Sequence, residues 1–204
     1  MHDAVSQYYQ YKISGKKMAP VDLLKAFRAV FDPQGFLDAK HQDERLRVGQ
    51  EALRRFFNDE EKRDSKPKFI EEPFNFKLDD VKITGRFDRI DEEPDGAVIM
   101  DFKTSEIKTQ KDANRRVKES KQLLLYSLAY QNISGSLPKR VELYFLESGI
   151  IGSTEVLEDG LGELKEKIKE VSEGIRSDNF QATPAYIACT YCAYNQICPF
   201  ALAK

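Results

Sequence analysis

The sequence predicts an α/β fold, in which a mixed β-sheet is flanked by helices and preceded by an N-terminal helical region. Residues 2–62 carry apolar side chains at helical spacing, and after Lys66-Pro67 the pattern changes to the alternation typical of strands. Residues 140–147 are apolar on both faces at their centre and follow a helical segment. They therefore predict an interior strand, parallel to an earlier strand and reached by a helical crossover.

The length and composition are those of a single domain. With 204 residues, 41% of them apolar, the chain can bury one substantial core. We expect a helical region at 1–65, a catalytic sheet core at 66–157, and a C-terminal helix followed by a cysteine tail at 158–204.

The helical region should contain three helices, at residues 2–12, 20–31 and 43–62. Pro20 suits the first turn of the second helix, and the segment 32–35 ends it. His41 precedes the third helix and has no acid or cysteine at a ligand-like spacing, so we interpret it as a surface residue.

Three strands should follow as an antiparallel meander, at residues 69–78, 81–90 and 96–104, with Asp79-Asp80 as the first turn. A buried helix at 120–131 then leads to the strand at 140–147, which we expect beside the 96–104 strand. A weaker edge strand at 152–157 and an amphipathic helix at 161–175 complete the pattern. The polar segment 104–118 lacks apolar periodicity, which is typical of a solvated loop or helix face.

Candidate chemistry lies in the meander. Because strand side chains alternate between faces, Asp101 and Lys103 point to one side while Met100 and Phe102 point into the core. The hairpin can bring Asp88 close to both. Two acids and a lysine can hold a divalent cation and act on a phosphate ester, although each alone could be a surface ion pair.

Four motifs occur in order along the chain. They are Gly-Arg-Phe-Asp-Arg-Ile-Asp at 85–91, Asp-Phe-Lys-Thr at 101–104, Gln-Leu-Leu-Leu-Tyr at 122–126 and Cys-x2-Cys-x5-Cys-Pro at 189–199. With them the chain resembles the RecB-family nucleases of the PD-(D/E)XK superfamily, of the AddB/RecB-like helicase-nuclease or CRISPR-associated exonuclease type. The resemblance covers roughly residues 81–200 and implies a restriction-endonuclease-like fold.

The resemblance also implies roles for individual residues. Asp88 and Asp101 would bind Mg²⁺ or Mn²⁺, and the backbone carbonyl of Phe102 would complete the metal shell. Lys103 would orient the attacking water or stabilise the charge of the transition state. Gln122 and Tyr126, four residues apart on one helix face, would lean over the site, whereas ordinary helix packing is the alternative.

His2 is a weaker match. The family places a metal-binding histidine on an N-terminal helix, which here continues through residues 5–9, so His2 is either a metal ligand or a frayed terminal residue. In the family further polypeptide with a first cysteine precedes this helix. We therefore expect the chain to be N-terminally truncated.

All three cysteines, Cys189, Cys192 and Cys198, lie close together near the C-terminus. Such clustering in an intracellular protein favours metal over disulfides, but three thiolates are one short of a four-cysteine site. The resemblance implies three ligands of a 4Fe–4S cluster in the full-length protein, with the fourth ligand absent from this chain. The alternative is three free thiols.

The net charge of −2 does not predict a nucleic-acid partner, so DNA contacts must come from local patches. Residues 103–121 hold seven basic side chains against three acidic ones. Solvated charges are one interpretation, and phosphate contacts by Lys108, Lys111, Arg115 and Arg116 are the other. The longest apolar runs are too short to cross a membrane and the N-terminus lacks a signal-peptide layout, so we expect a soluble, cytoplasmic protein.

The function predicted first is a metal-dependent DNA nuclease, an exonuclease acting on single strands or duplex ends. It would be a domain of a DNA-repair or recombination helicase-nuclease, with a helicase domain or subunit as partner. A nuclease-like module that has lost its chemistry and only binds DNA or protein is the alternative. A free-standing CRISPR-type nuclease would need a complete four-cysteine set.

Overall fold

The N-terminal region consists of three helices. In this computed structural model, which describes residues 1–63, 66–156 and 158–203, they are α1 (His2–Ile13), α2 (Pro20–Ala29) and α3 (Ala39–Lys62). Pro20 occupies the first turn of α2, as expected. Helix α3 begins four residues before the predicted start because the Asp38 side chain accepts a hydrogen bond from the amide of His41 at 2.7 Å. His41 therefore lies inside the helix, in its first turn.

Five strands form one mixed sheet in the order β1-β2-β3-β4-β5. They are β1 (Pro67–Leu78), β2 (Val81–Glu93), β3 (Gly96–Lys103), β4 (Arg140–Phe145) and β5 (Ile150–Glu155). The β3–β4 pair is parallel and the other three pairs are antiparallel. This confirms the meander, the interior parallel strand and the edge strand, which begins at Ile150 rather than Gly152 and pairs antiparallel with β4. The expected end of the last strand at Leu157 and the region boundary at Ser65 fall outside the described residues.

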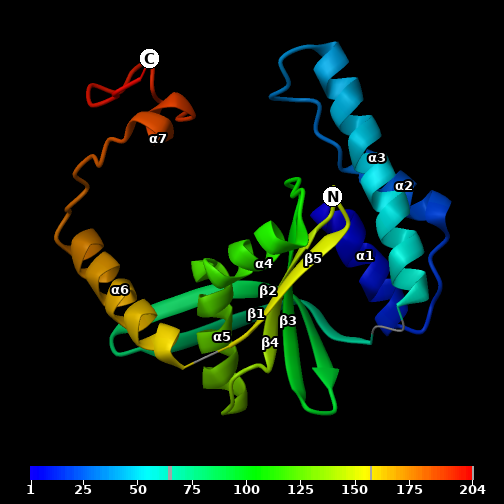
Figure 1. Ribbon diagram of the computed structural model, residues 1–204, viewed down its shortest axis with the longest axis horizontal. Coiled ribbons are helices and arrows are strands. Elements are labelled where there is room, and N and C mark those ends of the chain that lie inside the picture. The colour runs from blue at the N-terminus through cyan, green and yellow to red at the C-terminus, as the bar shows by residue number, and fades with distance from the viewer. Residues whose placement is uncertain (64–65, 157, 204) are drawn as a thin grey trace. The chain divides into compact units, whose positions relative to one another are not determined.

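Two helices connect β3 to β4. They are α4 (Gln110–Lys118) and α5 (Lys121–Ser134), each with a side-chain cap, from Thr109 and Ser120. Figure 1 shows α4 and α5 on one side of the sheet and α1, α2 and α3 on the other. The restriction-endonuclease-like arrangement of a mixed sheet flanked by helices is thus confirmed.

The main core lies between the sheet and the N-terminal helices. Tyr9 of α1 stacks on Phe102 of β3 with ring centroids 5.8 Å apart, and Phe56 of α3 contacts Tyr144 of β4. A second buried layer lies under α5 and includes Leu123. Met100 and Phe102 belong to the main core, as the alternation in β3 predicts.

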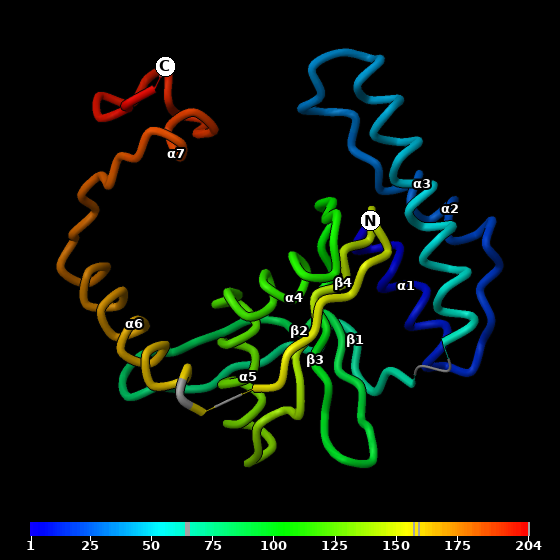
Figure 2. The backbone as a smooth tube through the Cα atoms, viewed as in Figure 1, coloured from blue at the N-terminus to red at the C-terminus, as the bar shows by residue number. Residues whose placement is uncertain are grey.

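The chain divides into two compact units, Met1–Leu164 and Lys165–Lys204. The first contains the whole sheet, which Figure 2 traces from β1 to β5. Helix α6 (Asp159–Arg176) begins in the first unit, where Leu161 is buried, and α7 (Tyr186–Thr190) lies in the second. No helix in the described ranges has the length and apolar character to span a membrane.

Candidate functional site

The predicted site lies where β2 and β3 part. Their pairing runs from Glu93 opposite Gly96 to Arg89 opposite Met100, and the next residues on the two strands are Asp88 and Asp101. Beyond this point the backbone amide of Phe102 donates its hydrogen bond to the Asp88 side chain, at Oδ2 and 2.9 Å, instead of to the backbone of β2. The sheet thus opens at the position of the two acids, and the Asp88 carboxylate lies against β3.

Strand β2 is strongly distorted at Asp88. Phe87 packs on Tyr126 of α5, with ring centroids 5.3 Å apart, whereas Arg89 lies over the ring of Tyr9 in α1 at 4.4 Å. In a regular strand residues i and i+2 point to the same face, so β2 turns over between these two side chains. Asp88 lies at this turning point.

Glu71 of β1 accompanies the distortion. It lies between Ile70 and Glu72, which pair with Arg89 and Phe87, so it faces Asp88 across the hairpin. Its φ of +54° is in the left-handed region, which costs energy for a side chain without special stabilisation. Its carboxylate contacts Arg86 Nε at 2.6 Å. Burial, and then the nearby Asp88 charge, raise its pKa against the lowering effect of Arg86.

Four predicted residues form one hydrogen-bonded group. Lys103 Nζ lies 2.6 Å from Asp101 Oδ2 and donates to Gln122 Oε1 at 2.7 Å. Gln122 Nε2 in turn donates to Asp101 Oδ1 at 2.7 Å and to the Tyr126 hydroxyl at 2.9 Å. Asp101 and Lys103 therefore share a face, as predicted, and Gln122 holds both.

Burial sets the electrostatics of this group. Asp101 is 1% exposed. Desolvation raises its pKa, the adjacent Lys103 ammonium opposes this, and the Asp88 charge raises it further. Desolvation also raises the pKa of Tyr126 to about 12, so its hydroxyl remains protonated at neutral pH. The two acids lie close enough that an added positive charge between them would relieve their repulsion.

His2 lies at the edge of this site. Its Nδ1 is 3.6 Å from Asp88 Oδ2, and its ring packs edge-to-face with the Phe102 ring, with centroids 6.2 Å apart. The first helical residue of α1 thus reaches the same carboxylate that bridges to β3. Whether it is a metal ligand stays a prediction.

A hard cation fits this donor set. Asp101 Oδ2 is buried and, among the described residues, receives no well-directed hydrogen bond in spite of its contact with Lys103. The described residues contain no group of three or more His, Cys, Asp or Glu arranged to hold a metal ion. Mg²⁺ commonly binds through one or two carboxylates, with water and substrate oxygens in the remaining positions, so Asp88 and Asp101 are donors of the type and number that it uses.

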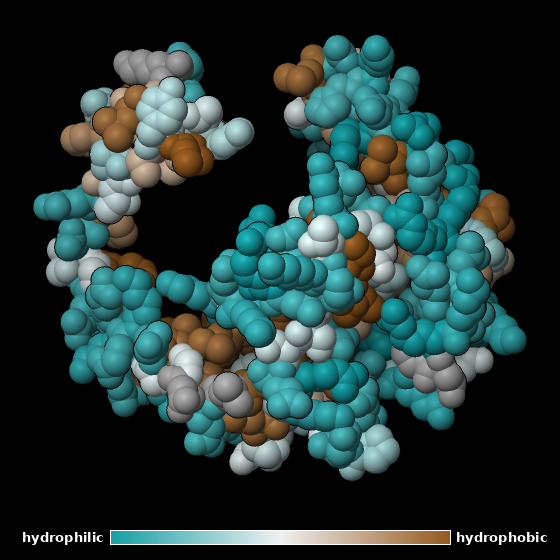
Figure 3. Space-filling model, viewed as in Figure 1, coloured by the Kyte–Doolittle hydropathy of each residue, from teal (hydrophilic) through white to brown (hydrophobic). Residues whose placement is uncertain are grey.

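Residues 110–118 of the basic segment form a helix, α4, and residues 104–109 before it belong to no helix or strand. Ala113 and Val117 of α4 are buried and explain its position, because Gly152 of β5 lets the α4 backbone approach closely. Helical geometry places Lys111 and Arg115 opposite this buried pair, on the exposed face. Figure 3 shows mostly hydrophilic side chains over this part of the surface.

The remaining basic residues of the prediction, Lys108 and Arg116, are also exposed. Arg115 donates to Asp112 at 2.8 Å within α4. None of these four side chains belongs to the hydrogen-bonded group around Asp101 in the described structure. Their contact with DNA stays a prediction.

The cysteines lie in the second unit. Cys189 and Cys198 are half-buried, Cys192 is exposed, and all three are free thiols. They are not assembled into a metal-holding group among the described residues.

Sequence reasoning missed Glu71, although the hairpin offered a signal. With the turn at Asp79-Asp80, Leu78 pairs with Val81, and counting back along both strands brings Glu71 opposite Asp88. An acid at that register would have been a candidate for the site.

Known proteins of two kinds, solved structures and a protein family, are similar to this chain. One similar solved structure is the crystal structure of a protein from Eubacterium rectale that is provisionally named an exonuclease. The match covers 96% of this chain and 74% of that protein, at 13% sequence identity and a TM-score of 0.47. The crystal structure of SSO0001 matches over 97% and 84%, at 14% identity and a TM-score of 0.45. A search of curated proteins finds no match. The family model of the PD-(D/E)XK nuclease superfamily matches residues 1–199, nearly the whole chain. The chain therefore belongs to the PD-(D/E)XK nuclease superfamily.

Proposed function

We propose that this chain is a metal-dependent nuclease that hydrolyses DNA phosphodiester bonds, as an exonuclease domain of a DNA-repair or recombination helicase-nuclease. The observation that carries the proposal is the meeting of Asp88 and Asp101 where β2 and β3 part, with Lys103 Nζ 2.6 Å from Asp101. A structural ion pair would need no second acid there. The RecB-like motifs support the exonuclease and helicase context.

Each residue of the group has a proposed role. Asp88 and Asp101 bind Mg²⁺ or Mn²⁺, together with the Phe102 carbonyl and His2. The bound cation supplies positive charge to the scissile phosphate and lowers the pKa of the attacking water. Lys103 orients that water and stabilises the charge that develops on the phosphate. Gln122 holds the Lys103 ammonium and the Asp101 carboxylate in place, and Tyr126 fixes Gln122.

The substrate backbone is proposed to follow the exposed basic side chains that precede α4 and lie along it. Four basic side chains are exposed in the segment that follows Lys103 in the sequence: Lys108, Lys111, Arg115 and Arg116. Phosphates are recognised by such side chains without regard to sequence. Neutralising them should therefore weaken binding and its salt dependence, and leave single-turnover cleavage of bound DNA unchanged.

The decisive test uses Asp101→Ala with end-labelled single-stranded and duplex DNA. Mg²⁺-dependent cleavage should fall by orders of magnitude while the folded state persists, as near-ultraviolet circular dichroism can verify. Mn²⁺ should raise the thermal midpoint of the parent and not of the variant. A parent that binds DNA, shows no cleavage and is not stabilised by Mn²⁺ would instead be a nuclease-like binding module.

The cysteine tail is proposed to supply three ligands of a 4Fe–4S cluster. Cys189, Cys192 and Cys198 are the only cysteines in the sequence, so a fourth ligand must come from another residue or polypeptide. Iron and acid-labile sulfide should be measured in protein purified anaerobically from the complete genomic reading frame. Absence of both would overturn this part of the proposal.

A further inference from the structure

A buried arginine lies directly beside the proposed metal site. Arg89 follows Asp88 in β2 and is only 1% exposed, the largest of the fully buried side chains. Its Nε and Nη2 donate to the two carboxylate oxygens of Asp91 at 2.7 and 2.5 Å. Its Nη1 contacts Glu60 Oε2 of α3 at 3.4 Å.

The same guanidinium connects α1 to the site. It lies over the Tyr9 ring at 4.4 Å, and that ring stacks on Phe102, whose amide donates to Asp88. Helix α1 also carries His2, which contacts Asp88. Arg89 thus supports the Asp88 carboxylate through the backbone of β2 and, by way of Tyr9, through β3.

Stability alone does not explain this arrangement. Replacing a buried ion pair by well-packed apolar residues is often neutral or stabilising, so such pairs are weak evidence of a stabilising role. Arg89 instead coincides with the turning point of β2, where Phe87 faces α5 and Arg89 faces α1. The Arg89 side chain therefore lies toward Tyr9 and Glu60 on the α1 side, the Phe87 side chain lies toward α5, and Asp88 is the residue between them.

We propose that Arg89 is a positioning residue of the metal site, which orients Asp88 and holds α1 with His2 against it. The inference rests on the proposed function, because it assumes that Asp88 binds the cation. Removing a group that is hydrogen-bonded directly to a metal ligand typically changes metal affinity about 10–100-fold, so for Arg89, which acts through the backbone and Tyr9, we expect the lower end of this range.

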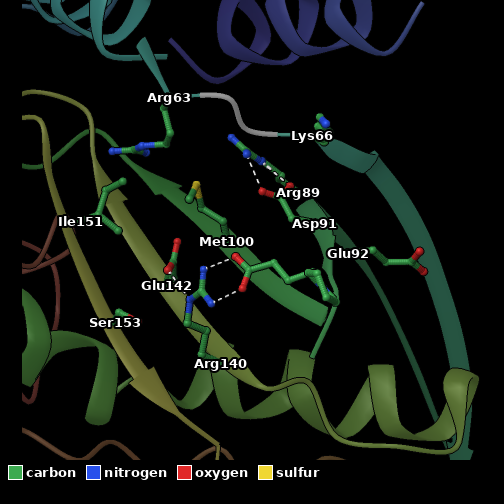
Figure 4. Close-up of a pocket in the computed structure, with 12 residues that line it drawn as sticks. Arg63, Lys66, Arg89, Asp91, Glu92, Met100, Arg140, Glu142, Ile151 and Ser153 are labelled. Carbon is green, nitrogen blue, oxygen red and sulfur yellow. Dashed lines mark hydrogen bonds and ion pairs between the residues drawn. The ribbon is translucent and has the colours of Figure 1, made fainter. Parts of the chain in front are cut away.

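A second arginine on the same sheet, paired with acids in a similar way but with its side chain 26% exposed, provides a control for the loss of an arginine–carboxylate pair. Arg140 of β4 donates to both carboxylate oxygens of Glu93 and to Glu142 Oε1 at 2.8 Å. Both arginines line one pocket of about 610 Å³. Figure 4 shows Arg89 with Asp91 and, at a separate place along the sheet, Arg140. Among the described residues, the ion pairs of Arg140 are with Glu93 and Glu142, and its strand does not carry Asp88.

The experiment measures Mn²⁺ binding to the whole chain by titration calorimetry, together with kcat and KM for single-stranded DNA. Arg89→Met should raise the Kd for Mn²⁺ about tenfold or more and accelerate amide hydrogen exchange in α1, with KM for DNA little changed. Arg140→Met should leave the Kd within about twofold. Arg89→Lys should not restore affinity, because an ammonium cannot bond both oxygens of Asp91 in the planar geometry of arginine.

If Arg89→Met does not fold, Glu60→Gln provides the test, since it loosens the tie to α3 while Asp91 still neutralises the arginine. Its Kd should also rise, by less. A folded variant of either kind that binds Mn²⁺ as tightly as the parent would overturn the positioning role and leave the proposed function intact. A parent that does not bind Mn²⁺ would overturn both.

Discussion

Replacing Lys103 by methionine separates catalysis from folding. The change removes the ammonium that lies 2.6 Å from Asp101 Oδ2 and 2.7 Å from Gln122 Oε1, and it keeps most of the aliphatic chain. Removing one group that stabilises charge in a transition state lowers kcat about 10²–10³-fold, or about 3–4 kcal/mol. The free energy of unfolding should fall by only about 1–2 kcal/mol, because Lys103 is partly exposed and Asp101 keeps its hydrogen bond from Gln122.

The pH profile of the same variant has a predictable direction. Lys103 lowers the pKa of Asp101 against the effect of burial, so its removal lets that pKa rise further. The carboxylate then ionises at higher pH, and the acidic limb of the activity profile should move to higher pH.

Single-turnover cleavage of end-labelled DNA at saturating Mn²⁺ measures the rate constant of the cleavage step, in which the loss should appear, and urea unfolding measures stability. Lys167→Met is the matched control, because Lys167 makes an ion pair of similar length, 2.7 Å to Glu170, on the surface of α6. It should leave activity unchanged. Residual activity of Lys103→Met within threefold of the parent would refute the role assigned to this ammonium.

Three further outcomes follow from the structure. Gly152→Ala would place a Cβ 2.5 Å from the backbone of Ala113, so α4 must shift, and urea unfolding should show a loss of about 1–3 kcal/mol. A Cβ added at Gly162 in α6 would meet nothing within 4 Å, so Gly162→Ala should raise the free energy of unfolding by about 0.5–1 kcal/mol in the same assay. An equal loss of stability in the two variants would contradict the packing argument. The native pKa of Asp101 is raised above its ordinary value of 3.8, so protonation favours the folded state, and this stabilisation is lost as pH rises through the native pKa. Unfolding of the metal-free parent, compared with Asp101→Asn between pH 4 and 7, should therefore show the parent losing stability relative to the variant as pH rises, whereas a constant difference would argue against the raised pKa.

Local pattern was sufficient to predict most of the sheet. Alternation in β1, β2 and β3 and the apolar centre of β4 reflect which faces are buried, so strand order followed from short connections and one helical crossover. The start of α3 was predicted at residue 43, too far along the chain, because the first turn is polar and is stabilised by the Asp38 cap rather than marked by apolar periodicity.

The geometry of the site was predictable only in part. Alternation placed Asp101 and Lys103 on one face, and four-residue spacing placed Gln122 and Tyr126 together. The distortion at Asp88 was not predictable, because it depends on tertiary contacts of the two neighbours that point to opposite sides of the sheet. Helix α4 was likewise hidden, since only two apolar residues anchor it and the space for it is made by a glycine distant in sequence.

The bond between the Asp88 carboxylate and the Phe102 amide affects how an inactive form of this protein should be made. Alanine at position 88 would remove a negative charge and would also leave the Phe102 amide without its acceptor, so lost turnover could reflect a rearranged β3. Asparagine keeps an oxygen for that donor while abolishing the charge. For trapping uncleaved DNA on an otherwise native surface, Asp88→Asn is therefore the appropriate choice, and superimposable amide spectra of β3 residues outside the immediate neighbourhood would verify it.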